Sequence, residues 1–316
     1  MVVPARDEER RLPGCLEPLA RDPDLLEVIV VDDESTDRTV DVAAALGARV
    51  VRGDRLPPGW AGKAWALEQG LRAAGGELVL FLDADARPRP GLARALAAAL
   101  GDADLLSAGP RFLCRSAVER LLHPALLATL VYRFGPTDVD GFQPRASRAT
   151  ANGQCVLVRR EALLAAGGWA SVRSHLTEDM ALARELRGRG RRIGFVDAAD
   201  LLEVEMYESA ADTWTGWGRS IAMADVTAPR QQAVDVACVW LCQAAPLLRV
   251  AAGRSGPLDW LLLAVRLALH AGLARSYRPR GPAFWLAPLA DGPAALRLTW
   301  SALRPSRSWR GRSYRA

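Results

Sequence analysis

The first 110 residues alternate short apolar runs with longer amphipathic segments, and this alternation restricts the folds that the chain can adopt. The apolar runs predict strands, at residues 2–4, 26–33, 48–51, 77–86 and 103–109. The segments between them predict helices, at residues 9–20, 35–47, 61–75 and 90–101, the second of them capped by Ser35 or Thr36. Buried strands that alternate with helices are typical of βαβ units. We therefore expect an α/β fold, with a mainly parallel sheet flanked by helices.

The later part of the chain is less regular and becomes apolar. Apolar segments recur after residue 230, at 234–252, 257–275 and 282–303. We therefore expect a domain at 1–230, an apolar helical, membrane-associated region at 231–303 and a basic tail at 304–316. Charged residues interrupt the apolar segments, so spanning helices, helices lying in the membrane interface and a soluble helical cap all remain open.

The composition narrows the classes of partner. Half of the 316 residues are hydrophobic, which excludes a disordered chain. The net charge of +5 suits nucleic acid, anionic lipid or a phosphorylated substrate. The arginines at 184–192 lack interleaved aromatic residues, so no nucleic acid is expected, whereas arginines and aromatics in the tail suit anionic headgroups. Five cysteines without a CxxC pair indicate a reducing, cytosolic environment. The chain opens directly on a predicted strand, which suggests a short or trimmed N-terminus.

Carboxylates gather where predicted strands end. The clusters are Asp7–Glu9, Asp32–Glu34, Asp83 with Asp85, and Glu178–Asp179. The carboxyl ends of parallel strands share one edge of a sheet, so the first three clusters should converge there. Like charges that meet in this way need a divalent cation or a bound nucleotide. Oxygen ligands without nearby histidine or cysteine suit Mg²⁺ or Mn²⁺ held together with a diphosphate.

Lys63 is the single lysine among 41 basic residues. It lies at a predicted helix start, just before the strand that leads to Asp83. An anion is favoured at such a place, so this flexible point charge is expected to reach the phosphate or base of a nucleotide. The alternative is a solvated surface lysine.

The motifs VVPARDEE, VIVVDDESTDRT, GKAWALEQGLRAAGGELVLFLDADARP and LTEDM occur in the order and spacing of family 2 glycosyltransferases. The chain resembles this family over roughly residues 1–225, which implies the GT-A fold with its Rossmann-like sheet. PPGWAGKAWAL, GGW before TEDMALA, GWGRS and the terminal WRGRSY resemble its membrane-associated branch. That branch includes carotenoid (diaponeurosporenoate-type) and hopanoid-associated glycosyltransferases.

The resemblance implies a role for each motif residue. Asp33 would bind the uracil edge, Asp85 would ligate the metal, and Asp179 would be the general base. Asp83 would touch the ribose or the metal. The other residues expected at the nucleotide sugar are Pro4, Ala5, Arg6, Glu8, Lys63 and Ala84. The chemistry agrees, because an inverting transfer needs a base opposite the leaving group and charge stabilisation on that group.

The acceptor side is expected at Glu178, Trp217 and Arg219. Trp217 would stack on the acceptor or the sugar, with core packing as the alternative. The Q-x-x-R-W motif of related processive enzymes is absent from the sequence around GWGRS, which favours a single sugar transfer over polymer synthesis.

These features predict the inverting transfer of a hexose, glucose being the expected sugar, from a UDP-sugar to a lipid acceptor at the cell membrane. The catalytic domain would lie on the cytoplasmic face. A carotenoid or other terpenoid is the expected acceptor, with a hopanoid or other glycolipid product as the alternative. A nucleotidyltransferase would show a Gly-rich loop after the first strand, where this chain has PARDEE. A non-catalytic nucleotide-sugar-binding membrane protein would have no use for a base together with a metal site.

Overall fold

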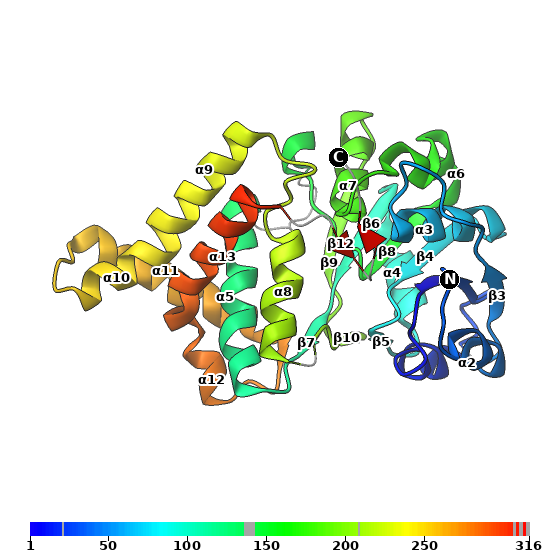
Figure 1. The fold of residues 1–316 in the computed structure, drawn as a ribbon, viewed down its shortest axis with the longest axis horizontal. Coiled ribbons are helices and arrows are strands. Elements are labelled where there is room, and N and C mark those ends of the chain that lie inside the picture. The colour runs from blue at the N-terminus through cyan, green and yellow to red at the C-terminus, as the bar shows by residue number, and fades with distance from the viewer. Residues whose placement is uncertain (21, 136–142, 208, 306–307, 310–311, 314–316) are drawn as a thin grey trace. The chain divides into compact units, whose positions relative to one another are not determined.

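The computed structural model describes the chain except for residues 21, 136–142, 208, 306–307, 310–311 and 314–316 (Figure 1). The chain forms two compact units. We call Met1–Arg111 with Thr137–Val204 the sheet unit, and Phe112–Pro136 with Glu205–Ala316 the helical unit. The second unit therefore includes a segment from the middle of the chain. The domain boundary predicted near residue 230 was based on sequence motifs, whereas these units are defined by packing. That boundary stays a prediction.

The sheet unit is built on a seven-stranded sheet (Figure 1). Its strands, in order across the sheet, are β3 (Arg49–Arg52), β2 (Ile29–Asp32), β1 (Val2–Ala5), β4 (Leu78–Leu82), β8 (Cys155–Arg159), β6 (Leu105–Gly109) and β9 (Ile193–Asp197). Strands β1 to β4 are parallel, as are β6 and β9. Only β8 runs antiparallel to its neighbours β4 and β6. The predicted mainly parallel α/β sheet is confirmed.

Helices and short strands complete this unit. They are α1 (Leu12–Leu16), η1 (Glu17–Leu19), α2 (Thr39–Ala45), α3 (Gly62–Ala73), β5 (Ala86–Pro88), α4 (Leu92–Leu100), η2 (Ala146–Arg148), α6 (Arg160–Ala165), η3 (Gly168–Val172), α7 (Glu178–Gly188) and β10 (Leu202–Val204). Strand β10 pairs antiparallel with β5. The predicted cap at Ser35 or Thr36 was wrong, because α2 begins at Thr39 and the Ser35 hydroxyl accepts the N–H of Asp7 at 3.0 Å.

Glycines set how closely α3 and the GGW segment pack in the core. A Cβ at Gly70 would lie 2.2 Å from Cγ1 of Val2, so this glycine lets α3 lie directly on β1. Gly168 has a φ of +64°, and a Cβ there would lie 2.5 Å from Oε2 of Glu68. That same Oε2 accepts the N–H of Trp169 at 2.9 Å. The Trp169 ring then packs edge-on against Phe81 of β4, which ties the GGW segment to the central sheet.

The helical unit contains the apolar half of the sequence. Its elements are α5 (Ala117–Phe134), α8 (Ala210–Ser220), α9 (Pro229–Val239), the π-helical η4 (Trp240–Ala244), α10 (Ala245–Ala251), α11 (Pro257–Leu273), η5 (Ala274–Ser276), α12 (Gly281–Trp285), η6 (Ala287–Ala290) and α13 (Asp291–Leu303). Strand β7 (Arg111–Leu113) pairs with β11 (Tyr277–Arg278) through Phe112 and Leu113, and β12 (Ser308–Trp309) pairs with β13 (Arg312–Ser313).

Two continuous helical stretches of this unit are long and apolar enough to cross a membrane, namely Pro229–Ala251 and Pro257–Ser276. Only 28% and 22% of their most apolar windows are buried. A core helix of a soluble protein would be mostly buried, and here the large apolar side chains face outward. The exposed ones on these stretches are Val234, Leu241, Leu248, Leu258, Trp260, Leu261, Val265 and Leu267.

The arginine within α11 is neutralised by a buried partner. Arg266 of α11 donates from Nε and Nη2 to the two carboxylate oxygens of Asp291 at 2.7 and 2.8 Å, and both side chains are buried. Gln243 of η4 donates to Oδ1 of the same aspartate at 2.8 Å. The arginine that interrupts the apolar run of α11 therefore faces α13 and leaves the apolar surface of the helix uncharged.

Candidate functional site

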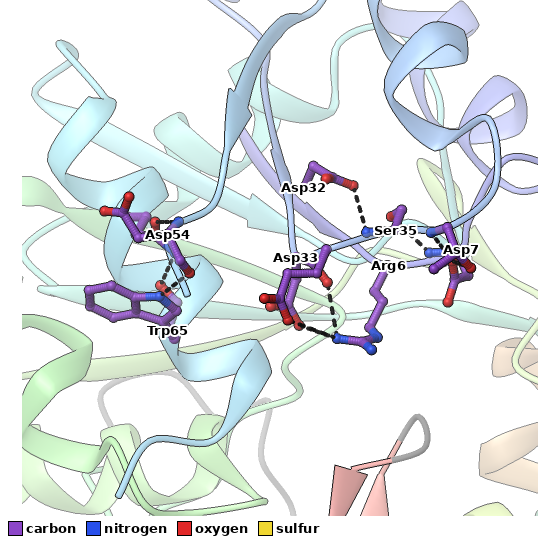
Figure 2. Close-up of polar contacts among 10 residues, drawn as sticks. Arg6, Asp7, Asp32, Asp33, Ser35, Asp54 and Trp65 are labelled. Carbon is purple, nitrogen blue, oxygen red and sulfur yellow. Dashed lines mark hydrogen bonds and ion pairs between the residues drawn. The ribbon is translucent and has the colours of Figure 1, made fainter. Parts of the chain in front are cut away.

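Two loops, after β1 and β2, are joined by hydrogen bonds (Figure 2). The Asp7 carboxylate accepts the N–H of Thr36 at 2.8 Å, and the N–H of Glu8 donates to Oγ1 of Thr39 at 2.8 Å. Asp7 and Glu34 have φ values of 53° and 58°, a region that non-glycine residues rarely adopt. The first two acidic clusters thus meet, as predicted, but Asp7 is used to hold the neighbouring loop.

Arg6 and Asp33 lie beside each other where these two loops meet (Figure 2). Nη1 of Arg6 donates to the backbone carbonyl of Asp33 at 3.1 Å and lies 3.7 Å from its Oδ2. Asp33 is buried, and its N–H donates to the carbonyl of Ala5 at 2.8 Å. Pro4 lies in β1, in register with Val31 of β2.

The third cluster is the turn between β4 and β5, where Asp83 and Asp85 flank the buried Ala84. Oδ1 of Asp85 is buried and has no hydrogen-bond partner among the described residues. Burial and the nearby Asp83 carboxylate raise the pKa of Asp85 to about 7, and Glu8 acts in the same direction, whereas Arg11 lowers it. An orphaned carboxylate oxygen of this kind is a natural ligand for a divalent cation.

Lys63, at the start of α3, connects this turn to α7. Its Nζ lies 2.8 Å from Oδ1 of Asp83 and 3.0 Å from Oε1 of Glu178. Burial alone would lower the pKa of the Lys63 ammonium, but Asp83, Glu178 and Asp179 together hold it well above its ordinary value. Burial raises the pKa of Glu178 to about 7 in spite of Lys63. Lys63 is therefore not the solvated surface lysine of the alternative interpretation.

Asp179, the second residue of α7, accepts two backbone hydrogen bonds. The N–H of Gly153 donates to its Oδ2 at 2.7 Å, and the N–H of Met180 donates to its Oδ1 at 2.8 Å. Burial raises the pKa of Asp179, while Lys63 and these two N–H groups lower it. Two backbone N–H groups therefore hold the Asp179 carboxylate in one orientation.

Sequence reasoning missed the turn that precedes β8. Ser107 of β6 accepts the N–H of Asn152 at 2.7 Å, and the Asn152 side chain accepts the N–H of Gln154 at 3.1 Å. The carbonyl of Gln154 accepts the N–H of Asp83 at 3.0 Å. One turn thus contacts both Asp83 and Asp179. The available signal was an Asn-Gly dipeptide directly before an apolar strand, which is typical of a turn.

Trp217 and Arg219, predicted on the acceptor side, lie on α8 in the helical unit. Trp217 is buried, and its ring packs edge-on against His123 with centroids 5.2 Å apart, whereas Arg219 is exposed. Glycines on either side of Trp217 make room for neighbours, since a Cβ at Gly216 would lie 2.1 Å from Tyr207. Trp217 thus occupies a core position of this unit, and its contact with an acceptor stays a prediction.

The charges around Lys63 suit a bound cation. Asp83, Asp85, Glu178 and Asp179 outnumber the two cations that act on them, Lys63 and Arg11. No group of three or more histidine, cysteine, aspartate or glutamate side chains in the described part of the chain is arranged to hold a metal by itself. A cation at Asp83 and Asp85 would therefore take its remaining ligands from a bound diphosphate or water.

Comparison with known proteins identifies relatives of this chain. The chain is 26% identical over 232 residues to the 4,4'-diaponeurosporenoate glycosyltransferase of Staphylococcus haemolyticus (strain JCSC1435), which covers 71% of this chain and 60% of that protein. It is 29% identical over 224 residues to the enzyme of the same name from Staphylococcus aureus (strain MRSA252). This match covers 68% of this chain and 59% of that protein. The chain thus spans about three fifths of the length of these relatives.

Among solved structures, the chain is similar to glucosyl-3-phosphoglycerate synthase from Mycobacterium tuberculosis in complex with Mn²⁺, UDP-glucose and phosphoglyceric acid. The two are 24% identical with a TM-score of 0.47, over 70% of this chain and 76% of that one. The family model for Glycosyl transferase family 2 matches residues 1–165, more than half of the 316. The family indicated by the motifs is therefore confirmed: the chain belongs to glycosyl transferase family 2, a family of inverting hexosyltransferases.

Proposed function

We propose that this glycosyltransferase moves a single hexose, glucose in the simplest case, from a UDP-sugar to the polar end of a membrane lipid, a carotenoid or other terpenoid. The observation that carries the proposal is the cluster around Lys63. It joins a pair of carboxylates suited to a metal, Asp83 and Asp85, to the helix that bears a partly buried, oriented carboxylate, Asp179. A nucleotide-sugar transferase needs both kinds of group close together.

The donor would bind across the loops that follow β1, β2 and β4. Asp33 would accept a hydrogen bond from the uracil, with Arg6 holding its loop. Pro4, Ala5, Glu8 and Ala84 would line the nucleotide through backbone and side-chain contacts. Lys63 would either share Asp83 with the metal or turn to the diphosphate.

Asp83 and Asp85 would hold Mg²⁺ or Mn²⁺, and the orphaned Oδ1 of Asp85 supports this assignment. A divalent cation at this place would neutralise the negative charge that develops on the leaving diphosphate. Without a cation, this buried oxygen has no partner among the described residues, which proteins rarely keep without a functional reason.

Asp179 would remove the proton from the acceptor hydroxyl as its oxygen attacks the anomeric carbon. The bond from that carbon to the diphosphate breaks, UDP leaves, and the proton stays on Asp179. The raised pKa of Asp179 makes it a stronger base than an ordinary aspartate. Glu178, fixed by Lys63 at 3.0 Å, would shape the acceptor side and keep α7 in place.

The lipid acceptor is supported by the apolar outer surface of the helical unit and by the relatives, whose name refers to a carotenoid acid. The two candidate spans would anchor the protein in the cell membrane, with the catalytic domain on the cytoplasmic face. A carboxylate acceptor is already ionised near pH 7 and needs no base, so a functional Asp179 favours a hydroxyl.

The test is UDP release by membranes that contain the protein, supplied with UDP-glucose and a terpenoid alcohol or a terpenoid acid of equal length. We expect Mn²⁺-dependent release with the alcohol, and loss of that release in Asp179→Asn. Release that Asp179→Asn leaves unchanged would overturn the base assignment. Release with the acid alone would overturn the hydroxyl acceptor and leave the donor chemistry in place.

The exposed Asp102→Asn is the matched control for this experiment. It makes the same chemical change on the surface of the sheet unit, where Asp102 lies 3.2 Å from Nη1 of Arg192. It should leave UDP release unchanged. Other nucleotide sugars, tested in the same assay, identify the donor. The proposal requires a uridine nucleotide, and the assay determines which hexose is transferred.

A further inference from the structure

A single glycine contacts the proposed base from outside its own helix. Gly153 belongs to the turn before β8, and its N–H donates to Oδ2 of Asp179 at 2.7 Å. The other N–H on Asp179 comes from Met180, the next residue of the same helix α7. The Gly153 bond is thus the one that depends on tertiary structure.

The side-chain space at Gly153 is already occupied by Asp179. A Cβ at residue 153 would lie 3.0 Å from both Cβ and Oδ2 of Asp179 and 3.1 Å from its Cγ. Gly153 is not among the residues with positive φ, so its backbone conformation does not require glycine. The absence of a side chain at this position is explained by the close approach of Asp179.

The turn that carries Gly153 is held firmly on both sides. The Ser107 hydroxyl accepts the N–H of Asn152 at 2.7 Å, and the side chains of Asn152 and Gln154 bond to each other at 3.1 Å. The next carbonyl, of Gln154, accepts the N–H of Asp83 at 3.0 Å. The same turn therefore fixes the backbone of the candidate metal turn and the carboxylate of the candidate base.

We propose that Gly153 is a positioning residue that sets the place and orientation of the Asp179 carboxylate relative to the donor turn at Asp83. This inference rests on the proposed function, because it requires Asp179 to act on the acceptor. The turn is built on β6 and β8, which are inside the sheet, so it places the base against a rigid frame. Lys63 makes a second link between α7 and the turn at Asp83, through Glu178 and Asp83.

The test is Gly153→Ala, measured as kcat/KM for acceptor-dependent UDP release and as the affinity for UDP with Mn²⁺. The added methyl displaces Asp179 by a few tenths of an ångström, and small misplacements of reacting groups are costly, so we expect kcat/KM to fall about tenfold or more. The affinity for UDP should stay within about twofold. A weakened N–H bond raises the pKa of Asp179, so the acidic limb of the rate profile should move to higher pH.

Two comparisons make the result specific to Asp179. Gly188→Ala, at the end of α7, is the matched control, because a Cβ at Gly188 meets no atom within 4 Å, and it should leave the rate unchanged. Gly153→Ala combined with Asp179→Asn should be no slower than Asp179→Asn alone. An additive loss in the double variant would show that Gly153 acts elsewhere and would overturn the inference.

The remaining outcomes separate the two proposals. A normal rate and pH profile in Gly153→Ala, beside an inactive Asp179→Asn, overturns the positioning role and leaves the proposed function intact. Full activity in Asp179→Asn overturns the base assignment, and the positioning role with it. Should Gly153→Ala fail to fold, Ser107→Ala decides, since losing its bonds to Asn152 should reduce kcat/KM and shift the same pH limb while UDP binding persists.

Discussion

Nζ of Lys63 lies 3.0 Å from Oε1 of Glu178, and the same ammonium lies 2.8 Å from Asp83, so one side chain holds the candidate metal turn and α7 together. A compact ammonium with its three donors can serve two carboxylates that approach from different elements, which the planar fork of arginine does not do equally well. This geometry gives a physical reason for a single lysine in a chain whose other basic residues are all arginine.

We expect Lys63→Met to destabilise the protein by about 3 kcal/mol, because breaking a mostly buried ion pair leaves a carboxylate without its partner. Thermal unfolding of the purified protein in detergent, followed by circular dichroism, measures the loss. Adding Glu178→Gln to Lys63→Met should recover part of it, since one unpaired carboxylate is then removed. A double variant no more stable than Lys63→Met would contradict this account.

Lys63→Arg should retain more stability than Lys63→Met but lose transfer activity.

The sheet and its carboxylates could be predicted because each element carries its own local signal. The runs that became β2 and β4 are continuously apolar and end in Asp32 and Asp83, so both the strand and the position of the acid at its end follow from the sequence. The family motifs lie on these same strand ends. The parallel direction of β1 to β4 was predictable because a helix was predicted between each strand and the next.

The partners of those carboxylates could not be predicted, because they depend on contacts between distant segments. Lys63 forms an ion pair with Glu178, which is far from it in the chain. Gly153 contacts Asp179 through its backbone N–H, so no side chain in the sequence signals this contact. The start of α2 was misplaced for a similar reason. Ser35 was available as a cap in the sequence, but in the structure its hydroxyl accepts the N–H of Asp7.

Glu178 should make the stability of the metal-free protein depend on pH. Its pKa is raised from 4.5 to about 7 by burial, so the folded state binds this proton more tightly than the unfolded chain. The contribution of this group is therefore fully present below about pH 4.5 and is lost as the pH rises to about 7. We expect the melting temperature in EDTA to fall between these values, and Glu178→Gln to flatten that fall. Glu161→Gln, at an exposed position of α6, should leave the slope as in the wild type.

Asp85→Asn should separate metal binding from folding. The variant keeps the shape of the side chain but removes the charge whose Oδ1 has no protein partner, so we expect the melting temperature in EDTA to be equal or higher. Calorimetric titration with UDP should show that Mn²⁺ no longer strengthens binding. A wild-type dependence of UDP affinity on Mn²⁺ in Asp85→Asn would exclude Asp85 as a ligand, and Asp102→Asn is the surface control.

The exposed face of α11 should carry the affinity for membranes. Leu258 and Leu261 are 65% and 61% exposed, and burying a leucine side chain in an apolar phase is worth about 1.5–3 kcal/mol. We expect Leu258→Glu with Leu261→Glu to move the protein toward the aqueous fraction in flotation with liposomes containing anionic lipid. The control places glutamate at Leu26 and Leu164, which are 81% and 41% exposed in the sheet unit, and should float as the wild type does. Neither double variant alters the internal Arg266–Asp291 ion pair. A loss of flotation confined to the Leu258 and Leu261 variant therefore reports contact with lipid and not helix packing. Equal flotation of the two double variants would show that the apolar face of α11 does not enter the bilayer.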